Sequence, residues 1–172
     1  MIFSFATDIG KAKKAAATFY SMLRDEPVID STEGAPLQDI QGKIEFDNVH
    51  FTYPNRPETT ILNGLSFSVN PGQHIALVGP SGCGKSTCFG LIERLYNTGS
   101  GKVLLDGKDI STLDVAQYRG ALAYVSQEPS IYSGTIRENI MLGCSPGQEV
   151  SEEDIIHACQ SANIYDFITS LP

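Results

Sequence analysis

The sequence contains no apolar run of the roughly 20 residues that a membrane-spanning helix needs. Residues 59–84 carry no charge, but polar residues interrupt this stretch too often for a lipid-facing segment. The short apolar start at 1–6 has neither the basic flank nor the small-residue cleavage site of a secretory signal peptide. We therefore expect neither a membrane span nor a cleaved leader within these 172 residues.

Metal-binding cysteine pairs and an excess of basic residues are also missing. Cys83, Cys88, Cys144 and Cys159 have neither CxxC nor CxxH spacing. Cys83 lies inside a glycine-rich loop where a disulfide would obstruct a ligand, so we expect reduced thiols in a cytosolic setting. The formal net charge of −8 disfavours nonspecific binding to nucleic acid. No Lys or Arg follows Arg137, and we interpret the acidic residues beyond it as a solvated helix face and a helix start.

The most informative segment that is present is a glycine-rich loop. Residues 79–87 match G-x-x-x-x-G-K-[ST], the phosphate-binding loop of nucleotide triphosphatases. The apolar run at 75–78 predicts a buried parallel strand before the loop. Apolar residues at helical spacing from Lys85 onward predict a helix after it. A chance glycine turn would not be expected to stand between such a strand and such a helix.

The residue types in this loop suit a phosphate chain. Its glycines allow unusual backbone angles and a close approach of the ligand, and successive N–H groups at a helix N-terminus form an anion-binding concavity. The lysine adds a charge for the β- and γ-phosphates, the serine hydroxyl can bind Mg²⁺, and the threonine adds a hydroxyl near the phosphates. The predicted nucleotide-binding residues are Gly79, Pro80, Ser81, Gly82, Cys83, Gly84, Lys85, Ser86 and Thr87.

The remaining patterns predict an α/β fold. Alternating apolar residues predict strands at 43–53 and 61–69, with a bulge at Asp47–Asn48 where the apolar parity changes. Ser151 and Asp154 form a capping box that predicts a helix through residue 162. The other expected elements are helices at 8–23, 113–119 and 136–141, strands at 103–105 and 122–126, turns at 70–72 and 106–107, and a linker with a domain boundary at 25–41.

Four passages together resemble the nucleotide-binding domain of ABC transporters, and most of all the multidrug-resistance type of exporter. The passages are residues 42–57, the phosphate loop, 103–110 and 125–140, of which the last is the most specific to the family. The resemblance implies a P-loop NTPase core with an N-terminal antiparallel β subdomain, truncated before the signature and Walker B motifs.

The resemblance also implies a division of the chain. Residues 1–25 resemble the cytosolic end of a transmembrane domain, 26–41 a linker, and 42–172 a partial ABC nucleotide-binding domain. An independent amphipathic N-terminal helix is the alternative for the first part. The implied partners are a second nucleotide-binding domain and the transmembrane domains of an exporter. The implied location is the membrane, with the nucleotide domain facing the cytosol.

Two further site residues follow from the resemblance, which implies ATP and Mg²⁺ as cofactors. Tyr53 matches the aromatic residue that stacks on adenine, and a ring at a strand end can offer a flat face to a base. Gln127 matches the family's Gln loop, whose side-chain carbonyl approaches Mg²⁺ and the attacking water. For Tyr53 the residues alone leave ordinary edge packing as an equal alternative.

Several family motifs are missing from this sequence. It has no LSGGQ-like signature, no later strand ending in Asp-Glu, and no switch histidine. Residues 103–106 imitate Walker B, but Gly107 stands where the catalytic glutamate would be, so we reject this segment as catalytic. We therefore expect ATPase activity in the full-length context only, and binding of MgATP without hydrolysis by this chain alone.

Two other functions compete with the exporter ATPase. A self-contained ATP-binding regulatory module without hydrolysis fits the 172 residues taken literally. A small kinase or GTPase would share the phosphate loop. A GTPase should also contain an N-K-x-D base-reading motif, which is absent, and the passage at 125–140 argues against this class.

Overall fold

The computed structural model divides into two units, Met1–Leu122 and Ala123–Pro172. It describes residues 2–25, 27–29, 34–144 and 147–171. The N-terminal unit begins with helix α1 (Ile2–Arg24), which is longer than the helix predicted at 8–23 and has exposed side chains from residue 9 onward. None of the helices in these described ranges combines the length and the apolar character that a bilayer crossing requires.

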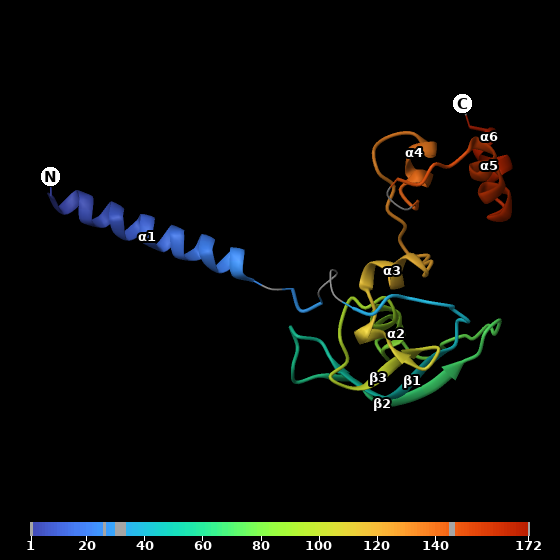
Figure 1. The fold of residues 1–172 in the computed structure, drawn as a ribbon, viewed down its shortest axis with the longest axis horizontal. Helices are drawn as coiled ribbons and strands as arrows, with labels where there is room; N and C mark the ends of the chain where they lie inside the picture. The colour runs from blue at the N-terminus through green and yellow to red at the C-terminus, as the bar shows by residue number, and fades with distance from the viewer. Residues whose placement is uncertain (1, 26, 30–33, 145–146, 172) are drawn as a thin grey trace. The chain divides into compact units, whose positions relative to one another are not determined.

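A four-stranded antiparallel sheet forms the centre of the N-terminal unit (Figure 1). It contains β1 (Ile44–Thr52), β2 (Thr60–Val69), β3 (Ser100–Leu105) and β4 (Lys108–Asp109), in the order β2-β1-β3-β4. These strands confirm the predictions at 43–53, 61–69 and 103–105. Asp106 and Gly107 both have positive φ, as a tight two-residue hairpin turn requires.

β1 contains the predicted bulge. Its pairing with both neighbouring strands shifts after Phe46 and Asp47, and Asn48 has a φ of 46°. Asparagine tolerates this left-handed conformation better than most residues. The extra residue leaves Phe46, Val49 and Phe51 all buried despite their uneven spacing. The parity change in the sequence therefore marks a real change of register.

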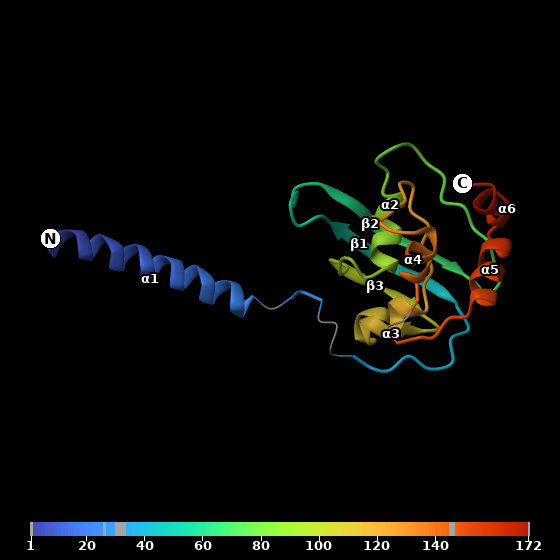
Figure 2. The same ribbon diagram turned by 90° about the horizontal axis from the view of Figure 1, so that it is seen from above.

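Helices α2 (Lys85–Ile92) and α3 (Val115–Gly120) cover one face of this sheet (Figures 1 and 2). Leu91 of α2 and Tyr118 of α3 are each only 1% exposed, and the Tyr118 hydroxyl donates to the Ile92 carbonyl at 2.6 Å. Between β4 and α3 lies the short 3₁₀ helix η1 (Ile110–Thr112). The core shared by sheet and helices consists of Phe46, Val49, Phe51, Leu62, Cys88, Leu91, Val103, Leu105, Ile110, Leu113 and Tyr118.

Two strand predictions are wrong. Residues 75–78 and 122–126 lie outside any sheet in the described part of the chain, and Val78 and Val125 are 92% and 91% exposed. A buried parallel strand needs hydrogen-bonded neighbours and helices covering both faces of its sheet. Neither segment pairs with another strand among the described residues. The α/β character of the fold therefore rests on the antiparallel sheet and its helices.

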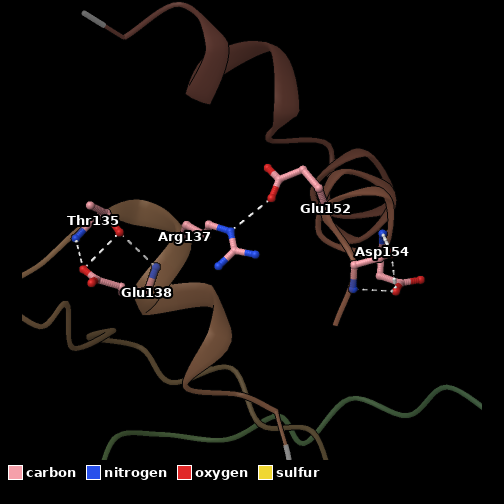
Figure 3. A network of polar contacts seen from close by, with 6 residues as sticks. Thr135, Arg137, Glu138, Glu152 and Asp154 are labelled. Atoms are coloured by element: carbon pink, nitrogen blue, oxygen red, sulfur yellow. Dashed lines mark hydrogen bonds and ion pairs between the residues drawn. The ribbon is translucent and has the colours of Figure 1, made fainter. Parts of the chain in front are cut away.

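The C-terminal unit contains α4 (Ile136–Met141), α5 (Glu152–Ser161) and α6 (Tyr165–Thr169). The predicted helices at 136–141 and 151–162 are confirmed, whereas α6 was not predicted. Thr135 with Glu138, and Ser151 with Asp154, form complete capping boxes at the starts of α4 and α5 (Figure 3). These boxes satisfy backbone N–H groups that the helices leave unpaired.

Candidate functional site

The glycine-rich loop has no regular structure until α2 begins at Lys85. Gly82 and Gly84 have φ values of 81° and 95°, in the left-handed region that favours glycine. A Cβ at Gly84 would also lie 2.9 Å from Leu62 Cδ2 of β2. The backbone therefore turns sharply into α2 at a point where any side chain would strain the backbone and displace Leu62.

The start of α2 can receive an anion. Its N-cap, Gly84, makes no side-chain capping bond, in contrast to the starts of α4 and α5. The first N–H groups of a helix have no acceptor within the helix, and the helix dipole adds partial positive charge there. Most of the loop before Gly84 is exposed. This combination suits the oxygen atoms of a phosphate group.

The Lys85 ammonium folds back over the loop. Nζ donates to the carbonyl oxygens of Gly79 at 2.8 Å and Pro80 at 2.7 Å, and lies 3.5 Å from Cys83 Sγ. Among the described residues Lys85 forms no ion pair. A phosphate oxygen would replace these neutral acceptors with stronger, charge-assisted hydrogen bonds.

The donors present fit a magnesium ion that arrives with a nucleotide. The Ser86 hydroxyl lies in the first turn of α2, and Ser86 is exposed. Mg²⁺ binds through few protein groups, completing its shell with phosphate oxygens and water. The described ranges contain no cluster of three His, Cys, Asp or Glu residues that could hold a metal ion alone. Within the loop, a metal would therefore be held by Ser86 together with the phosphates themselves.

Tyr53 follows the end of β1 and reaches the same helix. Its hydroxyl lies 2.9 Å from Oγ1 of Thr87, a buried residue in the first turn of α2. The Tyr53 ring meets Phe51 edge-on, with centroids 4.9 Å apart at 82°. Beside it is a hollow of about 460 Å³ lined by Tyr53, Pro54, Asn55, Arg56 and Tyr96. The structure thus brings the predicted base-stacking residue and the predicted phosphate loop together.

Gln127 belongs to the C-terminal unit and is exposed in a segment without helix or strand. The strand expected to end at Gln127 is not present. Its role near Mg²⁺ and water therefore stays a prediction from the family resemblance.

Asp106, in the segment that imitates Walker B, binds the backbone of residues 41–43. Its carboxylate accepts hydrogen bonds from the backbone N–H groups of Gln41, Gly42 and Lys43 at 2.8, 3.2 and 2.8 Å. Partial desolvation opposes ionisation, but these three bonds and the nearby Lys108 together hold the pKa of Asp106 below its ordinary value. This arrangement supports the interpretation of 103–106 as an ordinary strand and turn.

Sequence reasoning missed one residue of this region, Tyr96. It lies just beyond α2, lines the hollow beside Tyr53, and meets that ring edge-on at 5.2 Å. The only signal in the sequence is an aromatic residue after the phosphate-loop helix. That signal gives no information about contact with the distant end of β1.

Comparisons with known proteins identify the family of this chain. The sequence model of the ABC transporter family matches residues 62–172. The "ABC multidrug transporter mdr1" of Aspergillus fumigatus is 57% identical over 99% of this chain, and the "ABC multidrug transporter MDR2" of Trichophyton rubrum is 56% identical over all of it. The chain spans 13% of the length of each of these relatives.

A solved structure shares the fold of the chain. It is described as a bacterial Atm1-family ABC exporter with ATP bound, and it has 34% sequence identity and a TM-score of 0.75. The match covers 93% of this chain and 28% of that one.

Proposed function

Because this chain belongs to the ABC transporter family, we propose that it is the ATP-binding part of an exporter that couples ATP binding and hydrolysis to transmembrane transport. The observation that carries this proposal is the tie between Tyr53 and Thr87, which links a base-stacking ring to the helix that starts at the phosphate loop. A nucleotide needs a base site and a phosphate site at a fixed separation, and in this proposal the Tyr53–Thr87 contact sets that separation.

The roles in this proposal follow from the chemistry of each group. The Tyr53 ring stacks on adenine, and residues 79–87 surround the phosphates with N–H groups and the Lys85 ammonium. Ser86 contributes its hydroxyl to Mg²⁺, with Gln127 as a second ligand and as the group that positions water. Mg²⁺, when bound, neutralises negative charge on the phosphates.

The same proposal gives the chain its surroundings. Residues 1–25 form the cytosolic end of a transmembrane domain, 26–41 a linker, and 42–172 a partial nucleotide-binding domain that faces the cytosol. Its partners are the transmembrane domains and a second nucleotide-binding domain. Relatives named as multidrug transporters support an export function.

This chain alone is proposed to bind MgATP without turning it over. The sequence contains no Asp-Glu pair after a later strand to hold the metal shell and polarise water, and no LSGGQ-like signature. Each missing transition-state contact costs on the order of 10²–10³ in rate. A non-hydrolysing regulatory module would behave in the same way in isolation, and sequencing the full-length transcript distinguishes the two.

The test is calorimetric titration of the full chain with MgATP, beside Lys85→Ala and Lys102→Ala variants. Lys102 is an exposed lysine of β3, so its replacement removes the same charge away from the loop. Loss of the charge-assisted bonds at Lys85 should cost about 1.5–3 kcal/mol of binding free energy, whereas Lys102→Ala should bind like the parent.

Equal affinity in the parent and the Lys85→Ala variant would overturn the phosphate-site assignment. Released phosphate is followed in the same samples. Sustained Lys85-dependent hydrolysis of MgATP at about 1 s⁻¹, within the ordinary enzyme range, would contradict the proposal that the chain alone is inactive.

A further inference from the structure

Tyr96 fills the space between the end of β1 and the phosphate-loop helix. Its ring centroid lies 5.2 Å from that of Tyr53 at 88°, and 5.5 Å from that of Phe51 at 59°. On the helix side, a Cβ added at Gly90 of α2 would lie 3.6 Å from Tyr96 Cδ2, which is ordinary contact distance. The Tyr96 ring therefore lies against α2 at Gly90, at a distance that an alanine at this position would also allow.

These contacts leave the Tyr53 ring little freedom. Phe51 meets it edge-on from within β1, Tyr96 meets it edge-on from beyond α2, and the Thr87 hydroxyl bonds its oxygen. Edge-to-face geometry is a favoured arrangement of aromatic pairs. Two of the three contacts come from α2 and the residues just after it. The orientation of the ring is therefore set by the same helix that begins at the phosphate loop.

A ring fixed in advance binds a base more tightly than a mobile one. Ordering a side chain during association reduces affinity, and ordering it in the free protein avoids that loss. The hollow beside Tyr53, at about 460 Å³, lies within the size range of small-molecule sites. Tyr96 lines this hollow as well, so it contributes a second aromatic wall at right angles to the first.

We propose that Tyr96 is a positioning residue for base recognition: it holds the Tyr53 ring in place and closes one side of the hollow that receives the planar base of a nucleoside triphosphate. The inference rests on the proposed nucleotide-binding function and adds to it a residue outside the phosphate loop. Because Tyr96 acts on the base, its replacement should leave binding of a bare phosphate chain unchanged.

The test compares two ligands on the full chain by calorimetry, MgATP and magnesium tripolyphosphate, which has a phosphate chain but no base. Tyr96→Leu removes the ring, and Tyr96→Phe keeps it as the matched control. Tyr96→Leu should weaken MgATP binding about two- to tenfold, the range expected for a lost aromatic pair. The affinity of Tyr96→Leu for tripolyphosphate should not change. Tyr96→Phe should bind MgATP as tightly as the parent chain does.

A fluorescence experiment tests the positioning step directly. The sequence contains no tryptophan, so Tyr53→Trp introduces a single reporter at the base site. In that background, Tyr96→Leu should lower the fluorescence anisotropy of the nucleotide-free protein, because the ring gains freedom. Tyr96→Phe should keep the anisotropy of the Tyr53→Trp parent.

The outcomes separate this inference from the proposed function. If Tyr96→Leu weakens both ligands equally, or weakens neither, Tyr96 does not act on the base and the inference is overturned, while nucleotide binding stands. If the parent chain binds neither ligand, or if Lys85→Ala binds both unchanged, the proposed function itself fails and the inference fails with it.

Discussion

The two units of this chain stabilise their helices in different ways. In the N-terminal unit, α2 and α3 bury Leu91 and Tyr118 against a sheet in which β1 pairs with β3, a strand distant in the sequence. In the described part of the C-terminal unit, the buried apolar residues are Ile155 and Cys159, both on α5. Two of the helices there, α4 and α5, begin at complete capping boxes instead. Local signals are thus enough to define helices that have little core to pack on.

The C-terminal unit also has an apolar hollow at its surface. Ile136, Phe167 and Leu171 of the C-terminal unit are between 43% and 62% exposed and line an apolar hollow of about 540 Å³ within that unit. In the N-terminal unit the buried apolar side chains of the sheet, such as Val49 and Val103, form one core with residues of α2 and α3. Deleting a buried side chain should therefore cost most in the N-terminal unit, and deleting a cap should matter most in the C-terminal unit.

The largest effect is expected for Leu91→Ala. Leu91 is 1% exposed, and removing such a side chain leaves a cavity that costs about 2–5 kcal/mol. Urea unfolding combined with hydrogen exchange of peptides from β1 and β2 measures this loss. Leu95→Ala is the matched control, because Leu95 lies just beyond the end of α2 and is 55% exposed. A similar loss in both variants would mean that α2 does not stabilise the sheet through its buried face.

The second effect concerns a long-range polar contact of the N-terminal unit. Three backbone N–H groups at residues 41–43 depend on the Asp106 carboxylate. Its pKa is lowered in the folded state, so ionised Asp106 stabilises the fold above the unfolded pKa of about 3.9. This stabilisation is lost as the pH falls through the folded pKa.

Asp106→Asn measures that contribution. Urea unfolding should show the parent more stable than the variant at pH 7, with a difference that stays constant to about pH 5 and shrinks below about pH 4. Asparagine keeps one acceptor and tolerates the positive φ at this position, so the turn itself is preserved. A difference that does not depend on pH would show that the charge of the carboxylate is not what stabilises residues 41–43.

The sequence predicts those parts of the structure that depend on neighbouring residues. The phosphate loop, the bulge at Asn48 and the capping box at Ser151 are local patterns with a direct physical cause, and the structure shows all three. α6 has no side-chain cap at Ile164, so the sequence contains no capping pattern from which this helix could have been predicted.

The features that could not be predicted depend on distant partners. An apolar run such as 75–78 becomes a strand only where other strands bond its edges, and the run itself says nothing about them. The contact between Tyr53 and Tyr96 arises because α2 packs on the sheet. That packing joins residues from separate elements, and neither side chain shows its partner in the sequence around it.

A smaller effect is expected from the cap of α5. Ser151→Ala removes the oxygen that accepts from the Asp154 backbone N–H, and loss of such a cap costs about 1 kcal/mol. Hydrogen exchange of the first turn of α5 should speed up, while peptides of the sheet in the N-terminal unit should not change. Ser161→Ala, at the other end of the same helix, is the control. Equal effects at both ends would show that the capping box does not fix the start of α5.

The smallest effect is expected from the ion pair between α4 and α5. Arg137 Nε lies 3.0 Å from Glu152 Oε2, and both side chains are more than half exposed (Figure 3). Exposed pairs contribute about 0.2–1 kcal/mol and weaken in salt. Arg137 is also the only Lys or Arg in residues 123–172, which are otherwise acidic. Its charge therefore reduces repulsion within this unit as well as pairing with Glu152.

A double-mutant cycle separates the pair from this general charge effect. Arg137→Gln and Glu152→Gln are measured singly and together by hydrogen exchange of α4 and α5, at low salt and at about 1 M salt, where the Debye length falls to about 3 Å. The coupling free energy between Arg137 and Glu152 should be stabilising at low salt and should vanish at high salt. Glu153→Gln in place of Glu152→Gln gives the same change in charge beside the pair and should show no coupling with Arg137→Gln. Coupling of equal size at both glutamates would mean that Arg137 acts on the acidic unit as a whole rather than through one contact.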